Sequence, residues 1–590
     1  MGLSKNVASS KCSPCVGLVQ DGPGTSILTG TNTYTGATAV DAGTLDVNGT
    51  ITASSGFTIN SGGTLVGIGN IDAPTMTVMS GGTFAPGTPG VPGTSMTVTG
   101  NLAFQSGANY IVQLSPTATT FANVTGTAAL GGANVLAAFA PGAHAVKQYT
   151  TLESAGLNGT TFGPLGTANL PSNFNASLSY NSDDVFLNLN AVLGTGSGAV
   201  GNQANVANAV NNFFNSGGAL PPNFQTIFGL SGGNLTTALS QLSGEANTGA
   251  QQASFRMMSD FLGVMVDPSA GGRGGASGGA NGFAPEQAQE FPPDIALAYA
   301  SVLKAPSPPP PFAQRWTAWG QSFGGYNKTN GDAAAGTNTV TASAFGFAGG
   351  LDYHFTPDTT GGFALAGSGS NWSLAQNLGT GRSDSFQAGL YGTSRSGPAY
   401  ISGSIAFSNH WMKTDRFAPL GDQLTARFDA QSYGARVEGG YRYGTATIGV
   451  APYVALQAQL FHTPSYSETD LSGGGFGLSY AAMSATDARS ELGARFDNLQ
   501  VVDNMPLILG ARLAWAHDWV SNPALTATFQ TLPGANFVVS GAGMAANSAL
   551  TSAGAELRLS ANWSVEAKFD GEFAGNAQTY AGTGTIRYFW

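Results

Sequence analysis

The segment "WSVEAKFDGEF" (Trp563–Phe573) alternates charged and apolar residues with the two-residue period of a β-strand. One side of that strand carries four charged residues, Glu566, Lys568, Asp570 and Glu572. The opposite side carries Trp563, Val565, Ala567, Phe569 and Phe573. Because successive side chains of a strand point to opposite sides, the segment predicts a strand with one charged and one apolar surface.

The same alternation recurs upstream, in "DARSELGARFD" (Asp487–Asp497) and "LILGARLAW" (Leu507–Trp515). Twelve segments read as strands with no helix between them, starting near Arg315, Ala342, Gly361, Ser385, Tyr400, Ala430, Thr447, Ala485, Leu507, Ala549, Trp563 and Tyr580. An even number of antiparallel strands closes a barrel and removes the sheet edges, so we expect a transmembrane β-barrel over residues 312–590. A soluble sandwich also carries charges on its solvated face, so the alternation alone does not separate the two folds.

In such a barrel the charged faces line a wet lumen. The predicted lumen charges are Arg436, Glu438, Arg442, Arg489, Glu491, Arg495, Arg512, Glu556, Arg558, Glu566, Lys568, Asp570, Glu572 and Arg587. Aromatic residues near strand ends are expected to form girdles at the two membrane interfaces. The predicted girdle residues are Trp316, Trp319, Tyr391, Tyr443, Trp515, Trp519 and Trp563.

The chain ends on "GTGTIRYFW" (Gly582–Trp590), in the middle of a predicted strand. Ile586, Tyr588 and Trp590 share one side of it, and Arg587 and Phe589 share the other. An unpaired amphipathic strand can add to the sheet edge of a receptor, so these terminal residues are a candidate recognition signal. The same residues also suit a lipid-facing last strand.

Composition limits the classes of function. Only 9% of the 590 residues are charged, 42% are hydrophobic and the net charge is −11. Disorder and nucleic-acid binding are therefore poor explanations, and no stretch reaches 18 strongly apolar residues. The only cysteines, Cys12 and Cys15, predict an incidental or locally disulfide-bonded pair. The first 20 residues lack the apolar core of a signal peptide, so the leader lies upstream, the start is misplaced or the chain is a fragment.

The N-terminal half contains a repeat. "TAVDAGTLDVNG", "TINSGGTLVGIG" and "TVMSGGTFAPG" align on Gly43, Gly63 and Gly82, and no charged residue occurs from Ala73 to Val146. A period near twenty residues with alternating apolar positions predicts a β-solenoid in which each repeat forms one coil. A β-sandwich is the alternative.

These segments resemble a known family. "GGTFAPGTPGVPGTSMTVTGNLAFQSGANYIVQLSP" (Gly81–Pro116) is similar to the passenger-associated repeat of bacterial autotransporters, and residues 315–590 are similar to their translocator barrel. The resemblance implies an all-β protein with a right-handed parallel β-helix, a linker helix and a twelve-stranded barrel. The corresponding regions are a leader remnant at 1–20, a β-helical passenger at 21–200, a linker at 201–311 and the barrel at 312–590.

The linker contains one helical candidate with a clear apolar face, formed by Phe255, Met258, Leu262 and Met265. In the family a helix runs through the barrel lumen, and the resemblance favours 254–266 for it. The apolar face suits a polar lumen poorly, so packing against another element is the alternative. A second short helix is predicted over 292–305, followed by a stiff proline-rich spacer at 305–312. The pair Asn211-Asn212 is a weak candidate cleavage site.

The resemblance implies an outer-membrane protein of a Gram-negative bacterium whose barrel anchors and helps export its own passenger. Implied partners are outer-membrane lipid, periplasmic chaperones and the barrel-assembly machinery, which would read Ile586, Tyr588, Phe589 and Trp590. No catalytic, cofactor or metal motif is present, and the five histidines are scattered. The alternatives are an adhesin that binds host or neighbouring-cell ligands through its β-helix, and a diffusion pore with an extracellular β-domain.

Overall fold

The computed structural model describes residues 17–141, 146–266, 315–445, 447–520 and 522–590. The chain divides into two units, Met1–Gly198 with Ala207–Thr236, and Ala199–Val206 with Thr237–Trp590. Among the described residues, no helix combines the length and apolar character needed to span a bilayer. The predictions for Cys12 and Cys15, for the helix over 292–305 and for the spacer at 305–312 lie outside the described residues.

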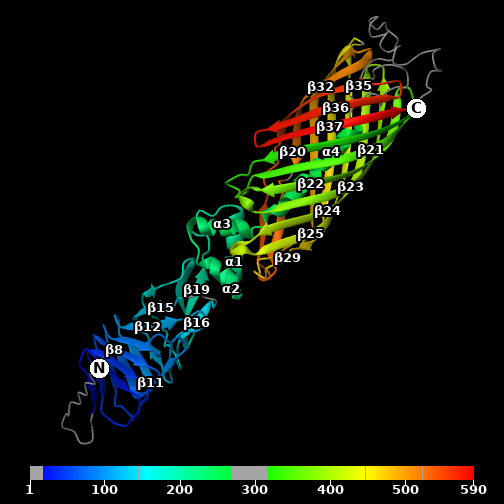
Figure 1. The fold of residues 1–590 in the computed structure, drawn as a ribbon. Coiled ribbons are helices and arrows are strands. Elements are labelled where there is room, and N and C mark those ends of the chain that lie inside the picture. Colours follow the sequence, from blue (N-terminus) through cyan, green and yellow to red (C-terminus); the bar gives the residue numbers. More distant parts are fainter. Residues whose placement is uncertain (1–16, 142–145, 267–314, 446, 521) are drawn as a thin grey trace. The chain divides into compact units, whose positions relative to one another are not determined.

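The first unit is a solenoid of short strands (Figure 1). One sheet has the order β1-β4-β7-β9-β11-β13-β16-β19-β18, with β3, β6 and β14 beside it, and the other has the order β17-β15-β12-β10-β8-β5-β2. The strands are β1 (Leu18–Gln20), β2 (Thr25–Leu28), β3 (Thr31–Asn32), β4 (Thr38–Val40), β5 (Gly43–Val47), β6 (Thr50–Ile51), β7 (Phe57–Ile59), β8 (Gly63–Gly67), β9 (Asn70–Val78), β10 (Thr83–Pro86), β11 (Ser95–Phe104), β12 (Asn109–Leu114), β13 (Phe121–Val124), β14 (Ala128–Ala129), β15 (Asn134–Phe139), β16 (Gln148–Glu153), β17 (Leu165–Ala168), β18 (Phe174–Tyr180) and β19 (Asp184–Ala191).

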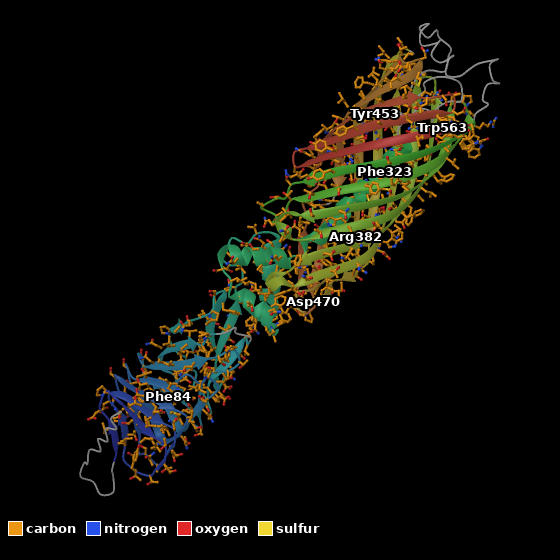
Figure 2. The ribbon with its side chains drawn as sticks, viewed as in Figure 1. Phe84, Phe323, Arg382, Tyr453, Asp470 and Trp563 are labelled. Carbon is orange, nitrogen blue, oxygen red and sulfur yellow. The ribbon has the colours of Figure 1, made fainter. Side chains whose placement is uncertain are left out.

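The pairing register follows the sequence repeat. β5 pairs with β8 in parallel with Gly43 opposite Gly63, and β8 pairs with β10 with Leu65 opposite Phe84. The inward positions form a continuous apolar core, in which the ring of Phe84 lies 5.8 Å from that of Tyr110 and is fully buried (Figure 2). The parallel, β-helix-like architecture is thus as predicted.

The end of the solenoid differs from a further parallel coil. β19 pairs antiparallel with both β16 and β18. A hairpin on the last coil supplies partners for the backbone groups of its sheet edge, which a parallel coil would leave open. This part of the predicted β-helical region is therefore an antiparallel cap.

Helices follow this cap from Asn202 onward, well before the helical candidate predicted over 254–266. They are α1 (Asn202–Asn215), α2 (Pro222–Phe228), α3 (Gly232–Leu242), the 3₁₀ turn η1 (Glu245–Thr248) and α4 (Gly249–Val266). Asn211 lies in α1, where its side-chain amide accepts from the Leu193 nitrogen at 2.8 Å and donates to the Leu193 oxygen at 3.0 Å. These two bonds give Asn211 a structural role in joining α1 to the cap.

The second unit contains the predicted closed antiparallel barrel of twelve long strands (Figure 1). They are β20 (Trp316–Thr329), β21 (Val340–Thr356), β22 (Thr359–Leu374), β23 (Thr380–Ser396), β24 (Ala399–Phe417), β25 (Gln423–Tyr441), β27 (Ile448–Thr463), β31 (Met483–Val502), β32 (Met505–Val520), β35 (Asn547–Arg558), β36 (Trp563–Ala574) and β37 (Ala577–Phe589). β20 pairs with β37 from Thr317–Phe589 to Thr329–Ala577, which closes the ring.

The two ends of the barrel differ. At one end, tight connections such as Gly397-Pro398 and Asp503-Asn504 join neighbouring strands, and the chain terminates there. The short strand β26 (Tyr443–Gly444) also lies at this first end. At the other end most connections are longer. They contain η2 (Ala375–Asn377), η3 (Pro419–Gly421) and the short strands β28 (Tyr466–Ser467), β29 (Thr469–Asp470), β30 (Leu478–Tyr480), β33 (Ala524–Phe529) and β34 (Asn536–Ser540). Long loops on one side and short turns on the other are typical of outer-membrane barrels, in which the long loops face outward.

The girdle prediction was wrong for two residues. Trp319 and Tyr391 point into the barrel, where they are 4% and 8% exposed, whereas Trp316 is 42% exposed on the outer face. Trp316 and Trp319 are three residues apart on one strand, so they cannot share a face. Trp319 instead donates a hydrogen bond to the Tyr391 hydroxyl at 2.7 Å.

Candidate functional site

The barrel lumen holds helix α4 (Figure 1). Its predicted apolar face is fully enclosed, with Phe255, Met258, Leu262 and Met265 all at most 2% exposed. Toward the outer end, Phe255 lies in a cluster with Trp372, Met412, Phe428 and Phe461. Toward the other end, the remaining three residues pack with Trp319, Phe323 and Tyr391. The lumen is therefore apolar along one wall, and the helix packs there.

Glycines shape this wall to fit the helix. A Cβ atom at Gly389 would lie 2.6 Å from the sulfur of Met265, and one at Gly434 would lie 2.7 Å from Cγ of Met258. Carbon contacts normally begin near 3.5 Å, so a side chain at either position would force the facing methionine side chain to move. Glycine in these strands thus provides close approach between the sheet and long helical side chains.

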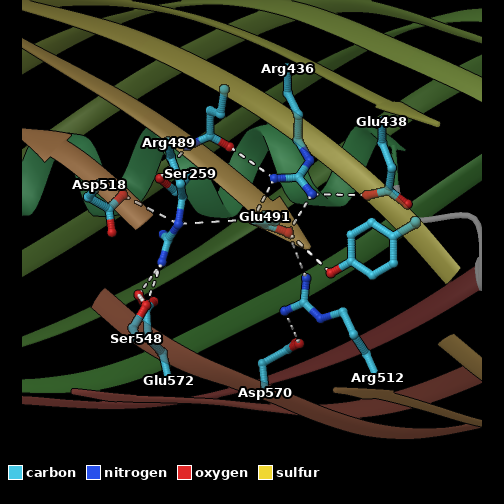
Figure 3. Close-up of polar contacts among 12 residues, drawn as sticks. Ser259, Arg436, Glu438, Arg489, Glu491, Arg512, Asp518, Ser548, Asp570 and Glu572 are labelled. Atoms are coloured by element: carbon cyan, nitrogen blue, oxygen red, sulfur yellow. Dashed lines mark hydrogen bonds and ion pairs between the residues drawn. The ribbon is translucent and has the colours of Figure 1, made fainter. Parts of the chain in front are cut away.

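The charged residues line the rest of the lumen, from β25 round to β37 (Figure 3). Arg436 binds Glu491 at 2.7 Å and Glu438 at 2.9 Å, and Arg495 binds Glu438 at 3.0 Å. Arg489 contacts Glu572 and also lies 3.4 Å from Asp518. Opposite charges thus alternate on neighbouring strands, and pairs of this kind offset the desolvation of each charged group.

The other predicted lumen charges are placed in the same way. Arg512 lies 3.8 Å from Glu491 and 3.7 Å from Asp570, which also contacts Lys568 at 3.2 Å. Arg587, which is 1% exposed, contacts Glu566 at 2.6 Å and Glu556 at 3.5 Å. Arg442 pairs with Asp497 at 2.6 Å near a short turn, and Arg558 stacks over the ring of Phe589.

Helix α4 contributes polar groups that the sequence analysis did not identify. Arg256 pairs with Asp260 on the same helix at 3.0 Å and with Glu572 of the wall at 3.5 Å. Ser259 accepts hydrogen bonds from Gln457 at 3.0 Å and Gln459 at 2.8 Å. Arg256 and Asp260 lie on the helix face opposite the predicted apolar one, and Ser259 lies at its side, so the helical period of the sequence already places these polar groups.

Asp518 was also missed, although strand parity contains the signal. It lies six residues after Arg512 on β32, so both side chains face the lumen. Between helix and wall a cavity of about 140 Å³ is lined by residues such as Arg256, Arg436, Lys568 and Asp570. Because acids and bases are paired across it, the arrangement suits a hydrated lining. In the described ranges, no group of three or more His, Cys, Asp or Glu side chains is placed to hold a metal ion.

Comparison with known families decides the nature of the barrel. Residues 318–570 match the family model described as the autotransporter β-domain. The barrel is an autotransporter β-domain. Residues 18–47 match the passenger-associated-transport-repeat, upstream of the segment at 81–116 compared above. The β-domain lies in the outer membrane, and its passenger lies at the cell surface.

Individual relatives are distant. An extracellular serine protease of Serratia marcescens is 24% identical over 266 residues, which cover 44% of this chain and 25% of that protein, so the chain spans about a quarter of its length. Among solved structures, the translocator domain of autotransporter NalP from Neisseria meningitidis is 13% identical, covers 46% of this chain and 88% of its own, and has a TM-score of 0.39. The transport unit of autotransporter AIDA-I from Escherichia coli is 13% identical, covers 51% of this chain and 99% of its own, and has a TM-score of 0.34.

The outer mouth of the β-domain encloses η1. Arg416 of β24 makes two 2.7 Å hydrogen bonds to Glu468, and Tyr480 lies 3.2 Å from the same carboxylate. The buried side chain of Asn247 donates to the Tyr480 hydroxyl at 2.8 Å and accepts from Thr414 at 2.8 Å. The short outer strands thus bind the chain where it enters the lumen.

A second buried acid, Glu245, also lies at this mouth. Its carboxylate accepts hydrogen bonds from the backbone and side-chain nitrogens of Asn338, at 2.7 and 2.6 Å. Burial raises the pKa of Glu245 to about 7, and these hydrogen bonds limit the rise. Glu245 therefore titrates near neutral pH.

The terminal strand of the β-domain is fully paired. Ile586, Tyr588 and Trp590 are 47%, 37% and 44% exposed on the outer face, while Phe589 is 5% exposed and faces inward. The Trp590 nitrogen donates to the Trp316 oxygen at 3.0 Å, so pairing extends to the last residue. Both edges of β37 are occupied by β20 and β36, so recognition of this strand by a receptor would precede barrel closure.

Proposed function

We propose that the β-domain exports its own N-terminal solenoid through the lumen and then anchors it on the cell surface. The observation that carries this proposal is the position of α4. The chain enters the barrel at the outer mouth through η1 and passes along the lumen to Val266, near Trp319 and Tyr391. A polypeptide that threads the barrel in its final state supports the lumen as the route of export.

The paired charges support a route that is wet. Arginine and carboxylate groups at fixed positions can hydrogen-bond the backbone of a passing segment without a strong preference for its side chains. The apolar wall then receives the Met/Phe face of α4 once export is complete. A lumen with one hydrated and one apolar side thus serves first for passage and then for closure.

Cysteine labelling of intact cells tests this topology. In a Cys12→Ser/Cys15→Ser background we place Asn175→Cys in the solenoid and, as the control, Asn504→Cys in a short turn of the barrel. A membrane-impermeant maleimide is expected to label the first variant in intact cells and the second only after permeabilisation. Labelling of Asn504→Cys in intact cells, or no labelling of Asn175→Cys, contradicts the proposed display.

We infer that folding of the solenoid outside the cell draws the chain outward, because each coil gains stability when it stacks on its neighbour. Gly63→Val tests this, since a Cβ there would lie 2.2 Å from the Val40 oxygen. The same change at Gly24, where no atom lies within 4 Å of the added Cβ, is the matched control. We expect slower surface appearance for Gly63→Val alone, and equal rates for both variants would refute folding as the driving force.

We propose that periplasmic chaperones hold the unfolded barrel and that the barrel-assembly machinery reads Ile586, Tyr588 and Trp590. An unpaired edge of β37 offers backbone groups and one apolar face to a receptor. Ile586→Ser/Tyr588→Ser is expected to slow the appearance of heat-resistant barrel in vivo. The control is refolding of the same purified variant in detergent without the machinery, where only a small change is expected. Equal slowing in both assays indicates a lipid contact and no recognition.

We propose a non-catalytic role for the solenoid and the barrel. His410 lies 2.8 Å from the Ser432 hydroxyl and His462 lies 2.9 Å from that of Ser484, but within the described part of the chain no carboxylate is hydrogen-bonded to either imidazole. A serine nucleophile needs a base that a third group orients. The purified chain is expected to stay unlabelled by a fluorophosphonate probe, whereas labelling that heat denaturation abolishes would indicate a serine hydrolase.

A further inference from the structure

Charged residues on the lipid-facing side of the barrel are confined to a small area. Within the described strands, outward-facing charges occur on β20, β23, β24 and β25 alone, namely Lys328, Arg382, Asp384, Lys413, Asp415, Arg427 and Asp429. Six of these seven residues lie on the three adjacent strands β23, β24 and β25, at the end with the long loops. An ordinary solvated rim would distribute its charges around the whole barrel.

Three cations stand side by side in this area. The strand register places Arg382 directly opposite Lys413, and Lys413 directly opposite Arg427. Like charges at directly opposed positions destabilise a sheet, so this row is unfavourable unless an anion covers it. Lys413 contacts Asp415 at 2.7 Å, and Arg382 interacts electrostatically with the same carboxylate, but among the described residues no hydrogen bond or close ion pair is formed by either guanidinium. Arg382 lies on the outer surface of β23 (Figure 2).

The row lies at the depth of lipid headgroups. The next outward position on β24 is Trp411, which is 51% exposed, and the aromatic Phe386 and Tyr433 follow on β23 and β25 toward the middle of the barrel. Exposed aromatic residues of this kind mark the interface between lipid chains and headgroups. Arg382, Lys413 and Arg427 lie beyond them, roughly 7 Å farther along the strands than Trp411.

An apolar groove lies farther along these strands and across the neighbouring strands β27, β31 and β32. It has a volume of about 700 Å³ and lies where Ala435, Ala458 and Ala488 stand side by side between larger residues such as Ile405 and Trp519. Ala435 is eight residues from Arg427 on β25, roughly 26 Å along the strand, and the strand tilt makes this roughly 20 Å along the membrane normal, so only the ends of acyl chains would reach the groove. Headgroup cations and an apolar groove thus lie in line on one face.

We propose that Arg382, Lys413 and Arg427 bind the phosphate groups of an outer-leaflet lipid whose acyl chains lie against β23–β27. Guanidinium groups suit phosphate because they donate parallel, charge-assisted hydrogen bonds. The acidic neighbours Asp384 and Asp429 lie one outward position nearer the membrane, so the three cations must act through direct contact and not through net charge. This site uses the outer-membrane placement of the barrel and is independent of whether the barrel exports the solenoid.

Lipid binding to the full-length chain in detergent tests the site. The probes are bisphosphorylated lipid A, the same lipid A after enzymatic dephosphorylation, and inorganic phosphate. The variants are Arg382→Gln/Lys413→Gln/Arg427→Gln and the matched control Lys328→Gln, an exposed outward lysine near the long-loop end of β20. Native mass spectrometry counts bound lipid, and unboiled gels confirm that each variant is folded.

We expect the unsubstituted chain and Lys328→Gln to retain bisphosphorylated lipid A, and the triple variant to bind it at least tenfold more weakly. Should the triple variant fail to fold, Arg382→Gln and Arg427→Gln are compared singly, and each is expected to weaken binding severalfold. Equal binding of the phosphorylated and dephosphorylated lipids, or undiminished binding by the folded variants, would overturn the proposal. Competition by inorganic phosphate at the concentration of the lipid would reveal a free-anion site and would equally overturn it.

Discussion

The solenoid and the barrel are both built from strands with alternating apolar and polar residues, but the apolar face points inward in the solenoid and outward in the barrel. Phe84 of the solenoid is completely buried, while Phe347 of the barrel is 60% exposed on its outer face. Conversely, Glu491 of the barrel is buried inside and its neighbour Leu492 is 59% exposed. Strand alternation therefore defines two faces, and the surrounding solvent decides which of them is the interior.

The barrel adds a second contrast inside its own lumen. Its glycine-lined wall packs against the apolar face of α4, while the rest of the lumen holds paired charges. The solenoid needs no such division, because its inward positions form one continuous apolar core. A solenoid therefore needs only an apolar interior, whereas this barrel needs an apolar surface for the helix and a charged, hydrated surface for the rest of its lumen.

The largest expected effect comes from comparing alanine substitutions at Phe84 of the solenoid and Phe347 of the barrel. Phe84→Ala should destabilise the solenoid by about 4 kcal/mol, because it removes a buried ring from contact with Tyr110 and Phe104. Phe347→Ala, on the lipid face, should cost about 2 kcal/mol, because the ring loses its transfer from water to lipid but leaves no packed cavity. Urea titration of the full chain, followed by proteolysis of the solenoid and gel mobility of the barrel, measures both. Similar losses in the two regions would contradict the inversion.

The second prediction compares a charged lumen residue with its apolar neighbour on the outer face of the same strand. Glu491→Ala leaves Arg436 without its 2.7 Å partner and should cost about 3 kcal/mol. Leu492→Ala, the adjacent residue on the outer face, should cost about 1–2 kcal/mol, the transfer of part of a leucine side chain from lipid to water. The measurement is the urea midpoint of the unboiled barrel. A greater loss for Leu492→Ala would show that lipid packing outweighs the lumen network.

Much of this inversion was predictable from the sequence. The parity of "WSVEAKFDGEF" separates Glu566, Lys568 and Glu572 from Phe569, and the twelve strands start near the expected residues. The repeat at Gly43, Gly63 and Gly82 likewise predicted the register of β5, β8 and β10. Both succeed because period-two alternation and fixed repeat length are local properties of the chain.

The fit of α4 to its wall was not predictable. Strand parity gives no sign that Gly389 and Gly434 will face Met265 and Met258, because their contact depends on how the whole barrel closes around the helix. The expectation of a uniformly polar lumen made the Met/Phe face look unsuitable. Trp319 is not a girdle residue because its position three residues after Trp316 places it on the inner face of β20.

The third prediction concerns Glu245, a buried acid at the outer mouth that is held by hydrogen bonds and not by the lumen arginines. Glu245 is held by Asn338 amides, and its pKa is raised to about 7 from an ordinary value of 4.5. An acid with a raised native pKa stabilises the closed state fully below pH 4.5 and loses this contribution as pH rises toward 7. The shift corresponds to on the order of 3 kcal/mol.

Hydrogen exchange of the Asn338 amide measures this effect. Exchange corrected for its intrinsic rate should be faster at pH 8 than at pH 5, because the closed mouth is less stable once Glu245 is ionised. The control is Glu245→Gln, which cannot titrate and should abolish the dependence. A protection factor that is constant with pH in the unsubstituted chain would contradict the raised pKa.

The smallest expected effect tests how α4 is held on its polar side. Ser259→Ala removes the acceptor of hydrogen bonds from Gln457 and Gln459, and it should weaken the helix by about 1 kcal/mol. Ser254 on the same helix is the matched control, since its buried hydroxyl has no hydrogen-bond partner within the described residues. Ser254→Ala should be neutral or slightly stabilising, because it removes an unsatisfied polar group. The readout is the frequency of open-channel events in planar bilayers, which rises when the helix leaves the lumen. If both alanine variants open equally often, the apolar wall alone retains the helix, and the glycine positions become the sites to substitute next.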